Sequence, residues 1–523
     1  MMVANRPGRH RQTQWGQLLG PLARGERPLR IELFSRLVAA IARGRLQAGD
    51  ALPSIRALAG ELGISRNTVI QAYALLMNEG LAASSPRSGF FISRSEAIEA
   101  PASTTAEQRS AALDGVDWQH RFRGSAADMP RLLKTSCWRD CKYQFVYGQY
   151  DAHSFPIRQW REAERTTMSV SSLRRWGADP YDSDDPELVR QIRDRILPRR
   201  GIWATDEEIL VTAGTQNALY LITRLLVGPS TRAAVEDPGY PDCVAVMLMY
   251  GAGVDTVPVD GEGLVVDNLL PEASLVYCTP SHQYPTTVTM SRLRRQALLA
   301  HARAHDAIII EDDYESESRF SGQAIPALKS LDTDGRVIFI SSFSKSLAPG
   351  LRVGFVVGAR ELIAELRLLR RFVLRNPPTN NQHALANFIR YGYYDSHLQR
   401  LRRTHWARYA MLRNALEREL PELSYPALVG GSAIWLRLPP EVDAAQLATR
   451  MITHSVYAEI GDWLFRSPHS RSYLRIGFSS IAENLISDGI GLLAKGVRDE
   501  QAGGWTAGRL PPADRLIREP ITE

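Results

Sequence analysis

The 523-residue chain has few cysteines, no long apolar run and no complete metal-binding motif. Its cysteines are Cys137, Cys141, Cys243 and Cys278. Cys137 and Cys141 have three residues between them and no second pair completes a zinc-type ligand set, so we predict no metal and idle or buried thiols. No apolar stretch approaches the roughly 18 residues that a membrane helix requires, and MMVANRPGRHRQTQWG has no apolar signal core. We therefore expect a cytoplasmic protein that does not span a membrane.

Lysine is absent from the first 94 residues, which carry 13 arginines against five acidic residues. This segment has a net charge of +8, whereas the rest of the chain has −2, within a total of +6. Concentrated positive charge is typical of a domain that neutralises phosphate groups, although basic solvated faces are also common elsewhere. Because the chain is longer than one hydrophobic core usually organises, we expect several domains, the first of them basic.

The hydrophobic pattern of the basic segment predicts helices followed by a β-hairpin. Apolar residues at helical spacing from Ile31 to Ile41 predict an amphipathic helix. LPSIRALAGELGISRNTVIQAYALLMNEG then predicts two helices that are capped by Ser54 and Ser65 and separated by a break at Gly63. LAASSPRSGFFIS predicts two short strands around a turn. This order of elements is that of a helix-turn-helix followed by a wing.

The second helix of the pair has one apolar and one polar face. Its apolar residues between Val69 and Leu76 share a face, which leaves polar side chains pointing outward at the N-terminal half. These side chains are Arg66, Asn67 and Gln71. Residues of these types can hydrogen-bond to base edges in the major groove of DNA.

Residues 44–92 resemble the winged helix-turn-helix domain of the GntR regulator superfamily. They follow its pattern GxLxxGxxLPSxRxLAxxLGxSRxTVxxAYxxLxxEGLxxxxxxSGxFV nearly throughout. The resemblance implies a domain that binds double-stranded promoter DNA over residues 27–93, and the composition of residues 94–120 predicts a linker. The residues that we assign to DNA contact are Arg56, Ser65, Arg66, Asn67, Thr68, Gln71, Arg87, Ser88 and Gly89.

Between residues 120 and 495, short apolar runs alternate with segments of helix length. The runs include EEILVTAG, RAAVEDPGY, SLVYCTPS, AIIIEDDY, RVIFISSFS and VGFVVG. Strands separated by helices predict an α/β fold with a mostly parallel sheet, helices on both faces and ligands at the carboxyl ends of the strands. We assign this domain to residues 121–497 and a loosely attached tail to residues 498–523.

The polar residues after these runs fit an aldehyde cofactor better than a metal, a dinucleotide or a P-loop nucleotide. Lys345, at a strand end, can lose its proton in a dry cleft and form a Schiff base. Asp312, a carboxylate 33 residues earlier, can hold a pyridinium proton. Serine hydroxyls around Lys345, Arg352 and the helix start at Gly214-Thr215 can hold a phosphate dianion. An aldehyde, a pyridine and a phosphate together describe pyridoxal 5′-phosphate.

SFSKSLAPGLRVG resembles the cofactor-lysine motif of the fold-type I aminotransferases, and the resemblance covers roughly residues 145–495. It implies that Lys345 carries the cofactor as an internal aldimine and that Arg475 of YLRIGF grips the carboxylate of an amino acid. The cofactor contacts that it implies are Asp312 with the pyridine nitrogen, Tyr314 with the ring hydroxyl, Tyr240 stacked on the ring, and Gly214, Thr215, Gln216, Ser342, Ser344 and Arg352 at the phosphate. Asp313 is an alternative partner for the nitrogen.

A winged helix joined to an aminotransferase-like domain is similar to the MocR subfamily of GntR regulators. This resemblance implies a homodimeric, pyridoxal-phosphate-dependent transcriptional regulator. Such a protein senses an amine or amino acid by forming an external aldimine at Lys345 and thereby changes its binding to promoter DNA. The effector stays open among amino acids, aminobutyrate, taurine and ectoine-derived diamino acids, as does the choice between activation and repression.

Two other functions compete with this interpretation. One is an active aminotransferase that carries a DNA-binding domain. HQYPTT argues against it, because Tyr284 and Thr287 stand where aminotransferases typically have the asparagine and the glycine of NPTG. The other is a regulator whose effector domain has lost the cofactor, and the presence of Lys345, Asp312 and Arg352 argues against that.

Overall fold

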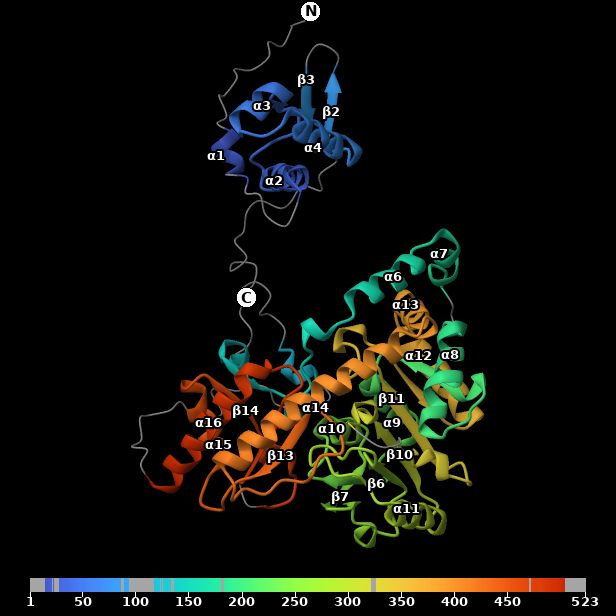
Figure 1. Cartoon of the computed structure of the whole chain (residues 1–523). Coiled ribbons are helices and arrows are strands. Elements are labelled where there is room, and N and C mark those ends of the chain that lie inside the picture. Colours follow the sequence, from blue (N-terminus) through green and yellow to red (C-terminus); the bar gives the residue numbers. More distant parts are fainter. Residues whose placement is uncertain are drawn as a thin grey trace, which may run out of the picture. The chain divides into compact units, whose positions relative to one another are not determined.

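The computed structural model describes residues 15–20, 22, 28–85, 89–93, 117–122, 124, 126–132, 136–179, 183–320, 326–469 and 472–503. The chain divides into two compact units, residues 1–123 and 124–523 (Figure 1). Within the described ranges, no helix is both long enough and apolar enough to cross a membrane.

The N-terminal unit contains four α-helices and a small antiparallel sheet in its described part. The helices are α1 (Trp15–Leu19), α2 (Leu29–Ala42), α3 (Ile55–Glu61) and α4 (Arg66–Asn78). The strands, in sheet order, are β1 (Ala51–Leu52), β3 (Gly89–Ile92) and β2 (Ala82–Ser85). The predicted caps are confirmed, because the Oγ atoms of Ser54 and Ser65 accept hydrogen bonds from the first turns of α3 and α4. Gly63 between them has a φ of 63°, which favours glycine.

Packing decides which row of α2 enters the core of this unit. The row from Ile31 to Ile41 recurs at helical spacing but is only half-buried. The buried row is Leu33, Leu37 and Ala40, which belongs to the same hydrophobic cluster as the buried residues of α4. Two apolar rows of one helix look alike in sequence, and the position of the neighbouring helix selects between them.

The C-terminal unit is organised by an eight-stranded sheet of order β5, β12, β11, β10, β9, β6, β7, β8. Its strands are β5 (Ile209–Thr212), β6 (Arg232–Asp237), β7 (Gly253–Asp260), β8 (Gly263–Leu264), β9 (Leu275–Cys278), β10 (Ile308–Asp313), β11 (Val337–Ser342) and β12 (Gly354–Val357). Pairs from β11 to β7 are parallel, whereas β12 is antiparallel to both of its neighbours and β8 is antiparallel to β7. The predicted mostly parallel α/β sheet is confirmed.

Helices cover both faces of this sheet because alternate residues of each strand point to opposite sides. Leu210 packs with α9 (Thr215–Leu226), α10 (Pro241–Met249) and α12 (Arg360–Leu374). Its neighbours Ile209 and Val211 pack instead with α8 (Pro186–Gln191) and α13 (Thr379–Arg390). Farther along that second face, α11 (Arg292–Ala304) packs on β9, β10 and β11. The strands are therefore apolar on both sides, as their sequences predicted.

A second, four-stranded sheet has the order β13, β15, β14, β4. Its strands are β4 (Tyr143–Phe145), β13 (Ala433–Arg437), β14 (Val456–Ile460) and β15 (Tyr473–Gly477). It shares one hydrophobic core with α14 (Tyr393–Glu419), α15 (Ala444–Thr453) and α16 (Glu483–Gln501), and Figure 1 shows α14 beside this sheet. Segments from both ends of the unit meet here, since β4 precedes the large sheet in sequence and the other strands follow it.

Candidate functional site

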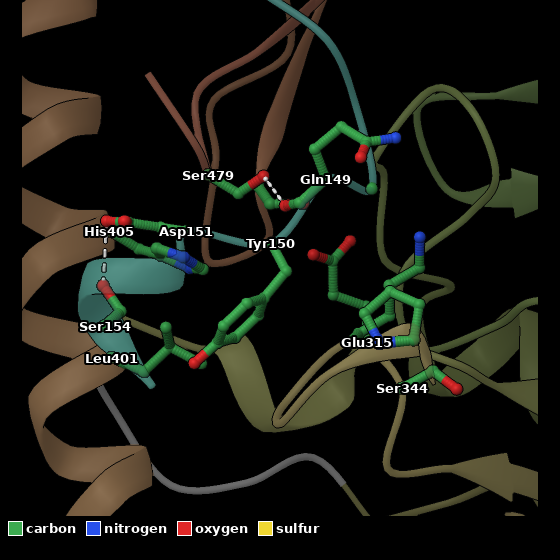
Figure 2. A pocket seen from close by; sticks show the side chains of 13 residues that line it. Gln149, Tyr150, Asp151, Ser154, Glu315, Ser344, Leu401, His405 and Ser479 are labelled. Carbon is green, nitrogen blue, oxygen red and sulfur yellow. Dashed lines mark hydrogen bonds between the residues drawn. The ribbon is translucent and has the colours of Figure 1, made fainter. Parts of the chain in front are cut away.

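The carboxyl edge of the large sheet places Lys345 three residues after the end of β11. Its Nζ atom lies 4.1 Å from the centre of the Tyr147 ring. Together with Ser344 and Glu315, Lys345 lines a pocket, and Figure 2 shows its polar wall. The predicted reactive lysine is therefore half-buried in a hollow rather than on an open surface.

The strand register brings the predicted phosphate-binding residues together. Gly354 of β12 pairs with Ser342 of β11 on one side and with Thr212 of β5 on the other, and α9 begins just beyond β5. Arg352 donates from Nη2 to the carbonyl oxygen of Ala213 at 2.6 Å. A side chain at Gly214, whose φ is 88°, would place its Cβ 2.9 Å from that same Nη2 atom. Glycine is favoured there because other residues rarely adopt this φ, and a side chain would also displace the guanidinium of Arg352.

The predicted hydroxyls lie at this same edge. Ser342 Oγ donates to Ser344 Oγ at 2.8 Å and accepts from the Ser344 amide at 3.0 Å. Gln216 in the first turn of α9 accepts a hydrogen bond from the hydroxyl of Tyr240 at 3.0 Å. The helix start, two hydroxyls and one guanidinium form the donor set that a phosphate dianion requires.

Asp312 and Asp313 point in different directions from the end of β10 and have different partners. Asp313 Oδ2 accepts from Arg200 Nε at 2.9 Å, so this carboxylate is part of a buried ion pair. Asp312 Oδ2 accepts from the hydroxyl of Tyr277 at 2.9 Å, whereas its Oδ1 is buried without a hydrogen-bond partner among the described residues. Burial raises the pKa of Asp312 to about 7, although the Tyr277 hydrogen bond opposes this. Of these two carboxyl groups, Asp312 therefore has an oxygen that can accept a hydrogen bond from a ligand.

Three tyrosine rings connect these residues. The ring of Tyr284 lies 5.4 Å from that of Tyr240 and 6.0 Å from that of Tyr314. The hydroxyls of Tyr284 and Tyr314 are buried and have no hydrogen-bond partner in the described part of the chain. Unpaired buried hydroxyls are costly unless a ligand satisfies them. The free oxygen of Asp312 and the hydroxyl of Tyr314 fit a cofactor with a ring nitrogen and a ring hydroxyl.

Arg475 of β15 is the most unusual charge in this region. Its side chain is 0% exposed, and its guanidinium carbon lies 3.3 Å from the centre of the Tyr147 ring and 4.3 Å from that of Tyr284. None of its three guanidinium nitrogens has a hydrogen-bond partner within the described ranges. A buried charge without a partner is strongly unfavourable. Glu459 lies opposite Arg475 in the register of β14 and β15 and is the carboxylate of this chain that acts on it, while the N–H groups of Arg475 remain open to the anion of a ligand.

Two residues of this site, Tyr147 and Glu315, were not predicted from the sequence. Tyr147 follows β4 and contacts both Lys345 and Arg475 with its ring. Glu315 follows Tyr314 and is 5% exposed. A recognisable signal existed for Glu315, because it extends a run of acids at a strand end. Tyr147 had none, since its contacts come from distant segments.

The described part of α4 presents the predicted DNA-reading face. Arg66, Asn67 and Gln71 are exposed, and the apolar residues from Val69 to Leu76 on the other face are buried. The hydroxyls of Ser65 and Thr68 form a hydrogen bond of 2.8 Å. Arg56 of α3 is exposed, and Gly89 is the first residue of β3. Arg87 and Ser88 lie outside the described residues. Ile70, which the sequence analysis left out, is 47% exposed on the same face and can contact a thymine methyl group.

Comparison with known proteins places these two units in context. The profile of "Aminotransferase class I and II" matches residues 144–487, and that of "Bacterial regulatory proteins, gntR family" matches residues 29–92. The HTH-type transcriptional regulator TauR of Rhodobacter capsulatus is 40% identical over 477 residues, which cover 91% of this chain and 97% of that protein. The probable rhizopine catabolism regulatory protein MocR of Rhizobium meliloti is 30% identical over 509 residues, covering 94% and 97%.

Solved structures are similar to the C-terminal unit. The kynurenine aminotransferase of Pyrococcus horikoshii, solved in a complex with PMP, has 27% sequence identity and a TM-score of 0.67. The alignment covers 73% of this chain and 98% of that one. The α-aminoadipate aminotransferase LysN of Thermus thermophilus has 25% identity and a TM-score of 0.66, with coverage of 74% and 100%.

Proposed function

Because the chain belongs to the family of HTH-type transcriptional regulators that join a gntR-type domain to an aminotransferase class I and II domain, we propose a pyridoxal-phosphate-dependent regulator with an amine effector. The N-terminal unit binds promoter DNA, and the site around Lys345 binds the effector. The observation that carries the proposal is the unpaired guanidinium of Arg475, which shares the Tyr147 ring with the amine of Lys345. An effector that has both an amino group and an anionic group can replace the amine of Lys345 and bind the guanidinium of Arg475.

Different residues of the site would bind different parts of the cofactor. Pyridoxal phosphate supplies an aldehyde that forms a reversible C=N bond with a primary amine. With the cofactor bound, Lys345 would hold the aldehyde carbon, Asp312 the ring nitrogen and Tyr314 the ring hydroxyl, and Tyr240 would contact the ring. The groups that would hold the phosphate are Ser342, Ser344, Arg352 and the start of α9 at Gly214, Thr215 and Gln216.

The effector's anion is held by the edge of the Arg475 guanidinium. The guanidinium lies against the rings of Tyr147 and Tyr284, and its N–H groups have no hydrogen-bond partner among the described residues, so they can bind a carboxylate or a similar anion. We propose that the chain acts as a homodimer in the cytoplasm, since a helix-turn-helix dimer reads two half-sites and fold-type I aminotransferases build their sites at a dimer interface. Effector binding shifts the dimer between DNA-bound geometries.

Capture of the amine without turnover is the feature that suits a regulator. Transamination requires a proton to move between two carbons in a fixed plane, and small displacements can cost about a hundredfold in rate. Tyr284 contacts Arg475 with its ring, whereas aminotransferases typically have at this position an asparagine that helps to hold the ring hydroxyl of the cofactor. Thr287 adopts a φ of 69°, which is unusual for a β-branched residue. The alternative function, an active aminotransferase with a DNA-binding domain, requires fast turnover despite these replacements.

One experiment separates the two functions. The protein is mixed with a panel of amino acids, 4-aminobutyrate and taurine, with 2-oxoglutarate as the amino-group acceptor. We expect one of these amines to give a stable spectral shift and altered binding to the DNA upstream of the gene, with little glutamate formed. Many turnovers per site at an enzyme-like rate would contradict the regulator and support the aminotransferase.

Replacing Arg66 by alanine is expected to weaken and blur DNA recognition. Arg66 opens α4 with an exposed side chain, and the loss of one contact to a base edge costs about 1–3 kcal/mol. Mobility shifts with the upstream DNA and a scrambled duplex measure the change at several salt concentrations, because affinity should fall steeply with salt. Arg45, exposed beyond the end of α2, supplies the control variant Arg45→Ala. Equal losses on both duplexes with Arg66→Ala would show that Arg66 contacts only phosphates.

In the cofactor-free protein, Asp312→Asn is expected to stabilise the fold at about pH 8 and to change little at about pH 4. The pKa of Asp312 is about 7 in the folded chain, against an ordinary value of 3.8, chiefly because of burial. Between these values the folded state retains a proton that the unfolded state has lost, so stability falls as the pH rises. Thermal denaturation of both proteins across this range measures the difference. A gap that does not change with pH would contradict the assignment.

A further inference from the structure

Glu315 brings a carboxylate into the cavity that contains the amine of Lys345. It follows Tyr314 at the end of β10, and its side chain is 5% exposed. Glu315 and Lys345 line the same pocket, and Figure 2 shows the Glu315 carboxylate directed into that space. A buried acid and a reactive amine therefore share one small volume.

The contacts of Glu315 differ from those of the other buried acids nearby. Its Oε2 atom accepts from the Tyr147 hydroxyl at 3.4 Å and lies 3.5 Å from His282 Nε2, and no arginine or lysine pairs with it among the described residues. Burial lowers the pKa of His282, so this ring is neutral at neutral pH. By contrast, Asp313 pairs with Arg200. A buried carboxylate without a cation costs folding free energy, so its presence points to a role in binding or chemistry.

Most of the other titratable groups around Glu315 are neutral or paired, and Lys345 and Arg319 are the remaining cations of the adjoining walls. Burial lowers the pKa of His405 on α14 to about 4 and raises the pKa values of Tyr147 and Tyr314 well above their usual values. The remaining charged groups of the adjoining walls are Lys345, Asp151 paired with Arg408, Arg200 paired with Asp313, and Arg319. Among the described residues of this cavity, Glu315 is therefore the carboxylate that forms no ion pair with an arginine or a lysine.

We propose that Glu315 is the proton carrier for amine exchange at Lys345. This inference rests on the proposed function. An amine arrives as an ammonium ion, whose nitrogen has no lone pair, and it gives one proton to Glu315. As the free amine bonds to the carbon that Lys345 held, its two N–H hydrogens pass to Lys345 Nζ, and the bond from that carbon to Nζ breaks. The released amine of Lys345 takes the proton back from Glu315, so that no proton is gained or lost overall.

The first test compares two amines that differ in the need for a proton acceptor. Ethylamine is protonated at neutral pH, whereas the nitrogen of methoxyamine carries no extra proton to give up. Stopped-flow absorbance follows the reaction of each with the wild type and with Glu315→Gln. We expect the variant to react with ethylamine about a hundredfold more slowly and with methoxyamine at the wild-type rate. Equal slowing of both amines, or of neither, would overturn the proposal.

The second test measures thermal stability in the cofactor-free state. Glu315→Gln removes an unpaired buried charge, so we expect a higher Tm than that of the wild type. Glu317→Gln is the matched control, because Glu317 lies near Arg199 and Arg402 and its loss should lower the Tm. A lower Tm for Glu315→Gln would indicate a structural role and overturn the proposal. Absence of a Lys345-dependent absorbance band in the wild type would instead overturn the proposed function together with this inference.

Discussion

Lys345→Ala is expected to abolish the yellow absorbance of the purified protein while leaving the chain folded. The half-buried Lys345 follows β11, lines one pocket with Ser344 and acts electrostatically on Asp312, so we expect the covalent bond to the cofactor to form at its amine. The loss should be complete, because alanine has no amine to replace the bond. Absorbance spectra measure the loss of the cofactor band, and circular dichroism measures whether the chain remains folded.

The control for this variant is Lys329→Ala. Lys329 is a half-buried lysine of the same unit whose Nζ pairs with Asp332 at 3.2 Å, and its removal should leave the absorbance unchanged. Borohydride reduction followed by peptide mapping then locates the attached cofactor in the wild type. A retained band in Lys345→Ala, or a label on another lysine, would move the reactive site elsewhere.

Arg475→Leu is expected to remove the response to amines that carry an anionic group. Truncating one member of a buried charge pair typically costs about 2–5 kcal/mol, which corresponds to a loss of affinity of about thirtyfold to several thousandfold. The response to ethylamine should persist, because that amine presents no anion to Arg475. Spectral titration with the best anionic amine and with ethylamine measures the two affinities. Equal losses for both would show that Arg475 supports the site without binding the ligand's anion.

A second fully buried arginine provides the matched comparison for stability. Arg370 is 0% exposed like Arg475, but its Nη1 atom pairs with the carboxylate of Asp184. Arg370→Leu leaves that carboxylate without this partner and should destabilise the fold by about 3–5 kcal/mol. Arg475→Leu removes a guanidinium that has no hydrogen-bond partner among the described residues, so we expect a smaller loss of Tm in the cofactor-free protein than Arg370→Leu causes. A large loss would indicate that Arg475 is needed for packing.

The DNA-reading helix illustrates what local sequence can predict. Helical spacing, the caps at Ser54 and Ser65 and the break at Gly63 depend on residues within a few positions of one another. The exposed face of α4 followed from those signals and is present in the structure. The apolar strands and the polar residues at their ends followed in the same way, because parallel strands place their carboxyl ends at one edge.

The identity of each partner across the C-terminal site could not be predicted from local pattern. Two adjacent aspartates looked equivalent in sequence, and the position of Arg200 beside one of them leaves Asp312 with a free oxygen. Cofactor-binding roles for these residues stay predictions until the variants above are measured. A strand directs successive side chains to opposite faces of the sheet, so Asp312 and Asp313 have different surroundings. Only the packing of the chain determines which groups lie on each face.

By itself, the sequence determined the order of the two domains, the parallel sheet, the outward face of α4 and the lysine, aspartate and arginine that gather at the sheet edge. Tertiary structure alone decided that Tyr147 and Tyr284 lie against Arg475 and that Glu315 faces the Lys345 cavity without an arginine or lysine partner among the described residues. Periodicity and capping act between near neighbours and are written in the local sequence. Burial and pairing of charges arise where distant segments meet, so they follow only from the packed chain.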